Sequence, residues 1–220
     1  MEPSFWHQRW AENQIGFHQE KINSRLIRFW PQLDLAAGAL IFVPLCGKTR
    51  DMLWLAEQGF DVLGVELSES ACEAFFHENG ISFESNRGDR FVEFSGAGVR
   101  LFAGDFFALT AMDLAGVTAF YDRAALVALP YSMRPKYALH MDTVLPPHCR
   151  GLCIGMSYDE TKMKGPPFSV TENEVRQLFE SAFDVEVIAE SSGPDIVGNL
   201  KDRGLDTLEE KVYHLVRRGN

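Results

Sequence analysis

The sequence predicts an α/β protein with a Rossmann-like, mostly parallel sheet, and three observations lead to this fold class. From about residue 37 onward, short apolar runs alternate with helical patterns. The run Ala39–Val43 is apolar throughout, as expected of a strand that is buried on both faces. One helical pattern later comes a second strand, Asp61–Val65, which ends at the acidic residue Glu66. This strand–helix–strand order is typical of a nucleotide-binding half of a Rossmann-type sheet.

Five further apolar runs extend the expected sheet to seven strands. They are Val99–Ala103, Val117–Tyr121, Gly151–Met156, Asp184–Ala189 and Lys211–Val216. Unless residues 193–207 supply a crossover helix, the last two strands are joined too briefly to be parallel, so one of the pair is expected to run antiparallel. Two capping boxes, Ser70 with Glu73 and Thr171 with Glu174, predict the starts of two helices.

The length and composition of the chain favour a single domain over residues 1–220. Its net charge argues against a nucleic-acid partner. The chain has 220 residues, 46% of them hydrophobic, and a formal charge of -10. A nucleic-acid partner calls for a dense basic cluster, which the sequence lacks. No export signal or membrane-length apolar run is visible, and the four cysteines form no close CxxC pair. We therefore expect a monomeric cytoplasmic protein with reduced thiols, no metal site and no membrane partner.

The first 36 residues are aromatic-rich and are expected to be helical. Trp6 and Trp10 lie four positions apart, on one face of such a helix, and Trp30 follows. Two interpretations are open at this point. The indoles pack against the core, or the segment forms a lid whose indole face lies near the positive charge of a cofactor.

Glu66 is the strongest candidate for a ligand-binding residue. It lies nineteen residues after Gly47, the separation expected for a carboxylate that accepts hydrogen bonds from two ribose hydroxyls. Two planar acceptor oxygens match the two donors of a ribose. The alternative is that Glu66 only caps the helix that starts near Ser68.

The turn after the first strand argues against a phosphate-binding loop. Gly47-Lys48-Thr49 resembles the end of a P-loop, but Phe42 occupies the position where that motif requires glycine. The turn also has only one glycine, whereas a dinucleotide pyrophosphate needs close backbone approach over several residues. A nucleoside cofactor without phosphate, such as S-adenosylmethionine, fits this turn better than NAD.

Two more strand ends are expected at the same edge of the sheet. Asp105 and Phe106 offer a carboxylate and an aromatic ring for an adenine. Asp122 and Arg123 end the following strand, and either bind a ligand there or form a structural ion pair.

Several stretches together resemble the thiopurine S-methyltransferase family, in order and with matching gaps. They are Ile15–Glu20, Phe42–Lys48, Gly64–Ser68, Tyr121–Leu126 and Gly165–Phe168. The resemblance implies a class I methyltransferase fold, with a seven-stranded sheet, helices on both faces and one antiparallel strand. It also implies methyl transfer from S-adenosylmethionine to thiopurines and related aromatic thiols. Bacterial members are associated in addition with methylation of selenium and tellurium compounds.

The resemblance also assigns roles to individual residues. It places Trp10, Leu45, Glu66 and Arg123 at the cofactor, and Asp105 with Phe106 along the adenine. It places Phe17 and the turn around Pro167 at the aromatic acceptor. One departure concerns the late loop, where eukaryotic members carry an arginine and this chain has Asn199, with Lys201 and Arg203 as substitutes nearby.

The expected reaction is direct displacement by a thiolate, for which no general base is required. The enzyme then contributes mainly proximity and alignment, and Arg123 either stabilises the anionic acceptor or fixes the cofactor. Two alternative functions remain at this stage. One is a nicotinamide-dependent oxidoreductase, and the other is a non-catalytic nucleotide-binding module.

Overall fold

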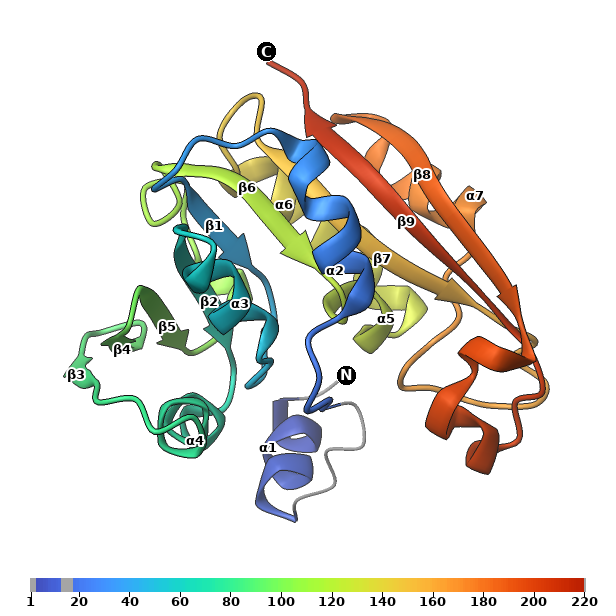
Figure 1. The fold of residues 1–220 in the computed structure, drawn as a ribbon, viewed down its shortest axis with the longest axis horizontal. Coiled ribbons are helices and arrows are strands. Elements are labelled where there is room, and N and C mark those ends of the chain that lie inside the picture. Colours follow the sequence, from blue (N-terminus) through green and yellow to red (C-terminus); the bar gives the residue numbers. More distant parts are fainter. Residues whose placement is uncertain (1–2, 13–17, 220) are drawn as a thin grey trace.

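The computed structural model describes residues 3–12 and 18–219, and its strands form one nine-stranded sheet (Figure 1). The strand order is β3-β4-β5-β2-β1-β6-β7-β9-β8. The strands span Leu40–Val43 (β1), Asp61–Glu66 (β2), Glu84–Arg87 (β3), Val92–Gly96 (β4), Val99–Ala103 (β5), Val117–Asp122 (β6), Arg150–Ser157 (β7), Phe183–Gly193 (β8) and Leu208–Arg217 (β9). All seven expected strands are present, so the predicted α/β class is confirmed.

The expected number of strands, seven, is wrong because a hairpin extends one edge of the sheet. Strands β3 and β4 pair antiparallel with each other, and β4 pairs antiparallel with β5. The central strands β5, β2, β1, β6 and β7 are parallel. At the other edge, β9 lies antiparallel between β7 and β8, as the short connection predicted.

Helices cover both faces of the sheet. The described α-helices span Pro3–Ala11 (α1), Ser24–Phe29 (α2), Asp51–Glu57 (α3), Glu69–Glu78 (α4), Ala125–Ala128 (α5), Arg134–Val144 (α6) and Glu172–Phe179 (α7). Apolar side chains of α5, α6 and α7 pack into one core cluster, which includes Phe120 and Leu126. Those of α2, α3 and α4 pack into a second cluster on the opposite face, which includes Trp30 and Phe75. Burial of both faces explains the continuous apolar runs of the central strands.

Short 3-10 helices connect several of these elements. They span Trp30–Leu33 (η1), Phe106–Ala108 (η2), Tyr131–Met133 (η3), Pro194–Ile196 (η4) and Gly198–Arg203 (η5). Residues 193–207 therefore hold two short turns, η4 and η5, in place of a crossover helix. In the described chain, no helix combines the length and the apolar character needed to cross a bilayer.

One of the two predicted helix caps is correct. Thr171 caps α7, since its hydroxyl accepts a hydrogen bond from the Glu174 amide. The prediction for α4 is wrong by two residues, because Ser68 rather than Ser70 is the N-cap and accepts from the Ala71 amide. The earlier start brings the N-terminus of α4 directly behind Glu66.

The N-terminal segment is helical where it is described. Helix α1 lies beyond the carboxyl ends of the central strands, and α2 packs on the sheet (Figure 1). Trp30 follows α2 and is buried in the core, so this tryptophan has a packing role. Asp51 of α3 holds the N-cap residue of α2 in place, because its carboxylate accepts a hydrogen bond from the Asn23 amide at 2.8 Å.

Candidate active site

The candidate residues gather where the parallel strands β1, β2, β5 and β6 end. These strands share one direction, so their carboxyl ends lie at the same edge of the sheet. Glu66 is the last residue of β2, and Leu45, Asp105 and Arg123 follow the ends of β1, β5 and β6. In open α/β sheets, this edge is where ligands bind. The structure thus brings together the four strand-end residues that the sequence singled out.

Glu66 is held by the backbone on both of its carboxylate oxygens. Its Oε2 accepts from the Gly47 amide at 3.0 Å, and its Oε1 accepts from the Ser68 amide at 2.9 Å. The side chain is only 7% exposed. Burial raises the pKa of this carboxyl, and hydrogen bonds from Ser68, Gly47 and Trp10 lower it in part. The Leu67 backbone also contributes a hydrogen bond, so this carboxylate already has four donors, about as many as a carboxylate accepts. A ligand hydroxyl at Glu66 therefore has to share or replace one of them.

The turn after β1 has a constrained backbone. Leu45 has a φ of 45° and Gly47 a φ of 54°, both in the left-handed region. For Leu45, as for any non-glycine residue, this conformation costs free energy and is typical of functional loops. The Cys46 amide ties the turn to β2 by donating to the Val65 carbonyl. Lys48 is occupied elsewhere, since its ammonium group pairs with Glu78 of α4 at 2.6 Å, which agrees with the rejection of a P-loop.

Trp10 of α1 lies against this turn. Its indole atoms come within 3.4 Å of the position that a Cβ on Gly47 would take. Its side chain also donates a hydrogen bond to Glu66. Trp10 therefore contacts the strand ends, whereas Trp30 is in the core.

Asp105 and Phe106 follow β5, but their side chains face different surroundings. The Asp105 carboxylate is exposed and accepts from the Phe107 amide at 2.9 Å, which starts the 3-10 turn η2. The Phe106 ring is 2% exposed and contacts Tyr137 and His140 with ring centroids 5.1 and 4.9 Å apart. His140 also bonds the Phe106 carbonyl at 3.1 Å, so α6 holds this residue from two sides.

Asp122 and Arg123 have separate roles, and the ion-pair alternative is wrong. The buried Asp122 carboxylate accepts from Tyr137 Oη at 2.7 Å and from the Ala125 and Leu126 amides at the start of α5. Burial raises its pKa to about 6. Arg123 is half-buried, and within residues 3–12 and 18–219 it has no ion pair or hydrogen bond. Its positive charge is thus available at the sheet edge.

The turn around Pro167 is fastened to the same region. The Phe168 amide donates to the Val127 carbonyl of α5 at 2.6 Å, four residues after Arg123. Tyr158 Oη donates to the Pro167 carbonyl at 2.6 Å. In the late loop, Arg203 donates to the Pro166 carbonyl at 2.7 Å, so this arginine reaches the turn. The other predicted acceptor residue, Phe17, lies outside the described residues.

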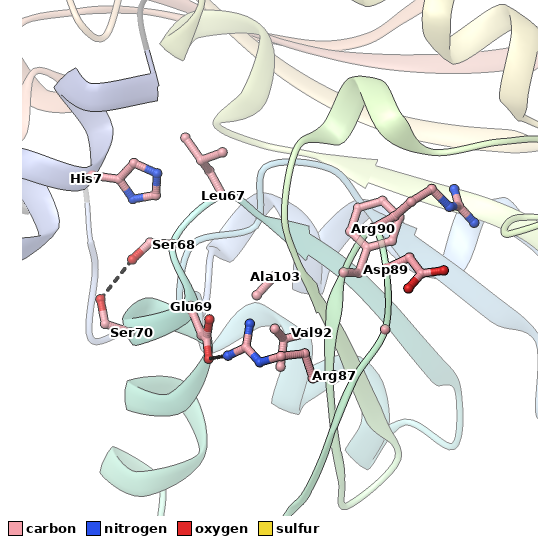
Figure 2. A pocket seen from close by; sticks show the side chains of 12 residues that line it. His7, Leu67, Ser68, Glu69, Ser70, Arg87, Asp89, Arg90, Val92 and Ala103 are labelled. Carbon is pink, nitrogen blue, oxygen red and sulfur yellow. Dashed lines mark hydrogen bonds and ion pairs between the residues drawn. The ribbon is translucent and has the colours of Figure 1, made fainter.

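A cavity of about 430 Å³ opens beside the β2 and β5 ends (Figure 2). Leu67 and Ser68 line it from the β2 end, and His7 of α1 faces them. On the far side is the turn of the β3–β4 hairpin, with Arg90 and Phe91. The hairpin that sequence reasoning missed therefore forms one wall next to the predicted nucleoside site.

Sequence reasoning also missed the buried residues that support the site. Asp51 accepts from Tyr121 Oη at 3.0 Å in addition to the Asn23 amide. It therefore links the N-terminal segment to β6, the strand that ends just before Arg123. Asp51 and Tyr137 lie in helical segments without a recognisable motif. Their hydrogen-bond partners become visible only in the tertiary structure.

Comparisons of the sequence with known proteins show the family to which the chain belongs. A family model described as Thiopurine S-methyltransferase matches residues 1–218. The Thiopurine S-methyltransferase of Pseudomonas fluorescens is 47% identical over 218 residues, covering 98% of this chain and 99% of the relative. That of Pseudomonas putida is 49% identical over 222 residues, covering 99% of this chain and 100% of the relative.

Solved structures with low sequence identity share the fold. A Burkholderia thailandensis 1,6-didemethyltoxoflavin-N1-methyltransferase with bound S-adenosylhomocysteine has a TM-score of 0.64 at 16% identity, covering 99% of this chain and 87% of that chain. A S-adenosylmethionine-dependent methyltransferase from Methanosarcina mazei also has a TM-score of 0.64, at 13% identity, covering 91% of this chain and 100% of that chain. S-adenosylmethionine is the cofactor, and the nicotinamide alternative is wrong. The chain belongs to the thiopurine S-methyltransferase family of S-adenosylmethionine-dependent methyltransferases.

Proposed function

We propose that this enzyme methylates the sulfur of aromatic and heterocyclic thiols such as thiopurines, and that selenium and tellurium compounds are further acceptors. The observation that carries the proposal is the environment of Arg123. Its half-buried guanidinium has no carboxylate partner among residues 3–12 and 18–219, and it lies four residues before the attachment point of the Pro167 turn. An anionic thiolate, selenolate or tellurolate is the kind of nucleophile that such a cation stabilises.

On the cofactor side, Glu66 binds the ribose hydroxyls through its carboxylate, where they replace or share donors that the carboxylate has without ligand. Leu45 in the left-handed turn lines the cofactor, and Trp10 covers the methionyl chain with its indole. Asp105 accepts from the adenine amino group. Phe106, with its ring packed in the core, contributes through its backbone.

On the acceptor side, Phe17 and Pro167 hold the flat ring of the substrate, while Arg123 faces its sulfur. When bound, S-adenosylmethionine supplies a methyl group that its sulfonium charge has already activated. Arg123 lowers the free energy of the ionised thiol, whose proton goes to solvent, so the chain needs no general base. The residues around Pro167 align the sulfur for in-line displacement.

Of the predicted lid segment, residues 1–36, we propose that the part around α1 covers the cofactor, since α2 and Trp30 pack in the core. Support comes from α1, since Trp10 contacts Gly47 and Glu66 and His7 lines the neighbouring cavity. We further propose that residues 1–220 are one domain and that the enzyme works as a cytoplasmic monomer on small molecules, without nucleic-acid or membrane partners.

The test is a methyl-transfer assay with labelled S-adenosylmethionine over a panel of acceptors. Thiophenol and 6-mercaptopurine are expected to yield labelled thioethers, and phenol and aniline of the same shape are expected to yield none. Selenite and tellurite, pre-reduced with thiol, test the metalloid acceptors separately. Transfer to aniline or phenol without transfer to any thiol would overturn the proposal.

A further inference from the structure

The turn of the β3–β4 hairpin lies directly on the segment that carries Asp105. A Cβ on Gly104 would come within 2.6 Å of the Phe91 ring and 2.9 Å of the Arg90 carbonyl oxygen. Phe91 also stacks on Phe102 of β5, with ring centroids 5.1 Å apart and an interplanar angle of 16°. Residue 104 is thus glycine because the hairpin backbone approaches it closely.

Arg90 fastens this hairpin turn to the loop that follows β5. Its guanidinium forms a two-point pair with the Asp113 carboxylate, with both N···O distances 2.8 Å. The same group donates to the Ala108 carbonyl at 2.7 Å. Ala108 is the last residue of the 3-10 turn that Asp105 starts. Arg90 therefore holds both ends of the loop, from Ala108 to Asp113.

Asp113 is fixed independently of Arg90. Its carboxylate accepts from the Thr110 amide at 2.7 Å and from the Thr110 hydroxyl at 2.6 Å. Its side chain is 14% exposed, against 46% for Arg90. Hydrogen bonds from Arg90 and Thr110 hold the pKa of Asp113 well below its usual range. A planar guanidinium bound at two points to a fixed carboxylate has one orientation, which makes the pair suitable for positioning.

We infer that Arg90 is a positioning residue for the adenine-binding segment, and that the β3–β4 hairpin sets how strictly the enzyme selects an adenine base. The inference rests on the proposed contact of Asp105 with the adenine amino group. With Arg90 removed, the turn Asp105–Ala108 loses its anchor at Ala108. The Phe107 amide still holds the Asp105 carboxylate, but its position is less strictly fixed. Arg90 acts through this turn, because its guanidinium is bound to Asp113 and to the Ala108 carbonyl.

The experiment compares Arg90→Ala with the wild-type enzyme for two ligands. S-adenosylhomocysteine carries an amino group at the purine edge, and S-inosylhomocysteine carries a carbonyl oxygen that an aspartate carboxylate repels. We expect Arg90→Ala to weaken S-adenosylhomocysteine binding about tenfold, as the weakening of the one charge-assisted hydrogen bond between Asp105 and the adenine predicts. The ratio of the Kd for S-inosylhomocysteine to the Kd for S-adenosylhomocysteine is expected to fall in the variant. We expect kcat at saturating cofactor to stay within about twofold of wild type.

Arg218→Ala is the matched control. The Arg218 side chain is also 46% exposed and pairs with a carboxylate, that of Asp184, at 2.8 Å. It also donates to backbone carbonyls, those of Glu180 and Phe183. These contacts lie near the ends of β8 and β9, so the control is expected to change the melting temperature without changing ligand discrimination.

The two conservative variants complete the test. Arg90→Lys is expected to keep part of the discrimination between the two ligands, and Asp113→Asn is expected to lose it as Arg90→Ala does. If Arg90→Ala does not fold, these two variants test the inference in its place. Unchanged discrimination in all three variants, with only a lower melting temperature, would overturn the inference. A wild-type enzyme that discriminates between the ligands but methylates no thiol would contradict the proposed function and leave the role of Arg90 intact.

Discussion

Replacement of Glu66 by glutamine is expected to separate ligand binding from folding. In the wild-type enzyme, each carboxylate oxygen accepts a backbone amide, that of Gly47 at 3.0 Å or that of Ser68 at 2.9 Å. Glutamine keeps one oxygen and places an NH2 group against the other amide. Two donors then face each other in a site that is 7% exposed.

The structure gives the size of both effects. One buried amide without an acceptor costs about 1–3 kcal/mol of the free energy of unfolding. At roughly 2–4 °C per kcal/mol for a chain of this size, the melting temperature falls by about 2–12 °C. Loss of a charge-assisted hydrogen bond to the ribose costs about 1.5–3 kcal/mol, which raises the Kd roughly 10- to 150-fold.

Isothermal titration calorimetry with S-adenosylhomocysteine measures the Kd, and thermal unfolding without ligand measures stability. Glu57→Gln is the control, because Glu57 is exposed at the end of α3, away from the strand ends. If Glu66→Gln lowers the melting temperature but binds the ligand as tightly as wild type, Glu66 is a structural cap for α4 and the ribose role is wrong.

Three other substitutions test the neighbouring groups. Arg123→Ala is expected to lower kcat/KM for thiols about 10- to 100-fold in steady-state assays, whereas unchanged turnover and cofactor affinity would exclude its role. Tyr158→Phe removes the hydrogen bond to the Pro167 carbonyl and is expected to raise the acceptor KM about fivefold with the cofactor KM unchanged; equal changes in both would contradict an acceptor-side turn. Asp122 has a folded-state pKa of about 6 against a usual 3.8, so its contribution to stability is present below pH 4 and falls by about 2 kcal/mol as pH rises from 4 to 7. In denaturant titrations Asp122→Asn should lack this fall, and a parallel pH profile in both proteins would refute the assignment.

The central strands were predictable because burial on both faces leaves a strong local signal. Runs such as Ala39–Val43 have few polar residues, and turn residues mark their ends. The order of strand, turn, helix and acidic residue then located Glu66 at the correct edge of the sheet. The antiparallel strand beside β8 followed from the short connection before it.

The β3–β4 hairpin was not predictable in the same way. Strand β3, Glu84–Arg87, has four exposed residues and no apolar one. Among the strands that the structure describes, β4 is its only hydrogen-bonded neighbour. An edge strand of this kind has no hydrophobic pattern, because it buries no side chain.

The supporting contacts of the site also had no local signal. The partners of Asp122 lie up to 15 residues away, and the Tyr121–Asp51 contact spans 70 residues. The sequence left open whether Asp122 and Arg123 bind a ligand or form a structural ion pair. In the folded chain, the α5 amides and Tyr137 take the carboxylate instead.

A structure of the enzyme with bound S-adenosylhomocysteine tests the account most directly. We expect the two ribose hydroxyls within about 2.6–3.2 Å of the Glu66 carboxylate, with the adenine between Leu67 and the segment after β5. An adenosine bound at another edge of the sheet, or a ribose that is held by other residues while Glu66 keeps only its backbone partners, would contradict the account.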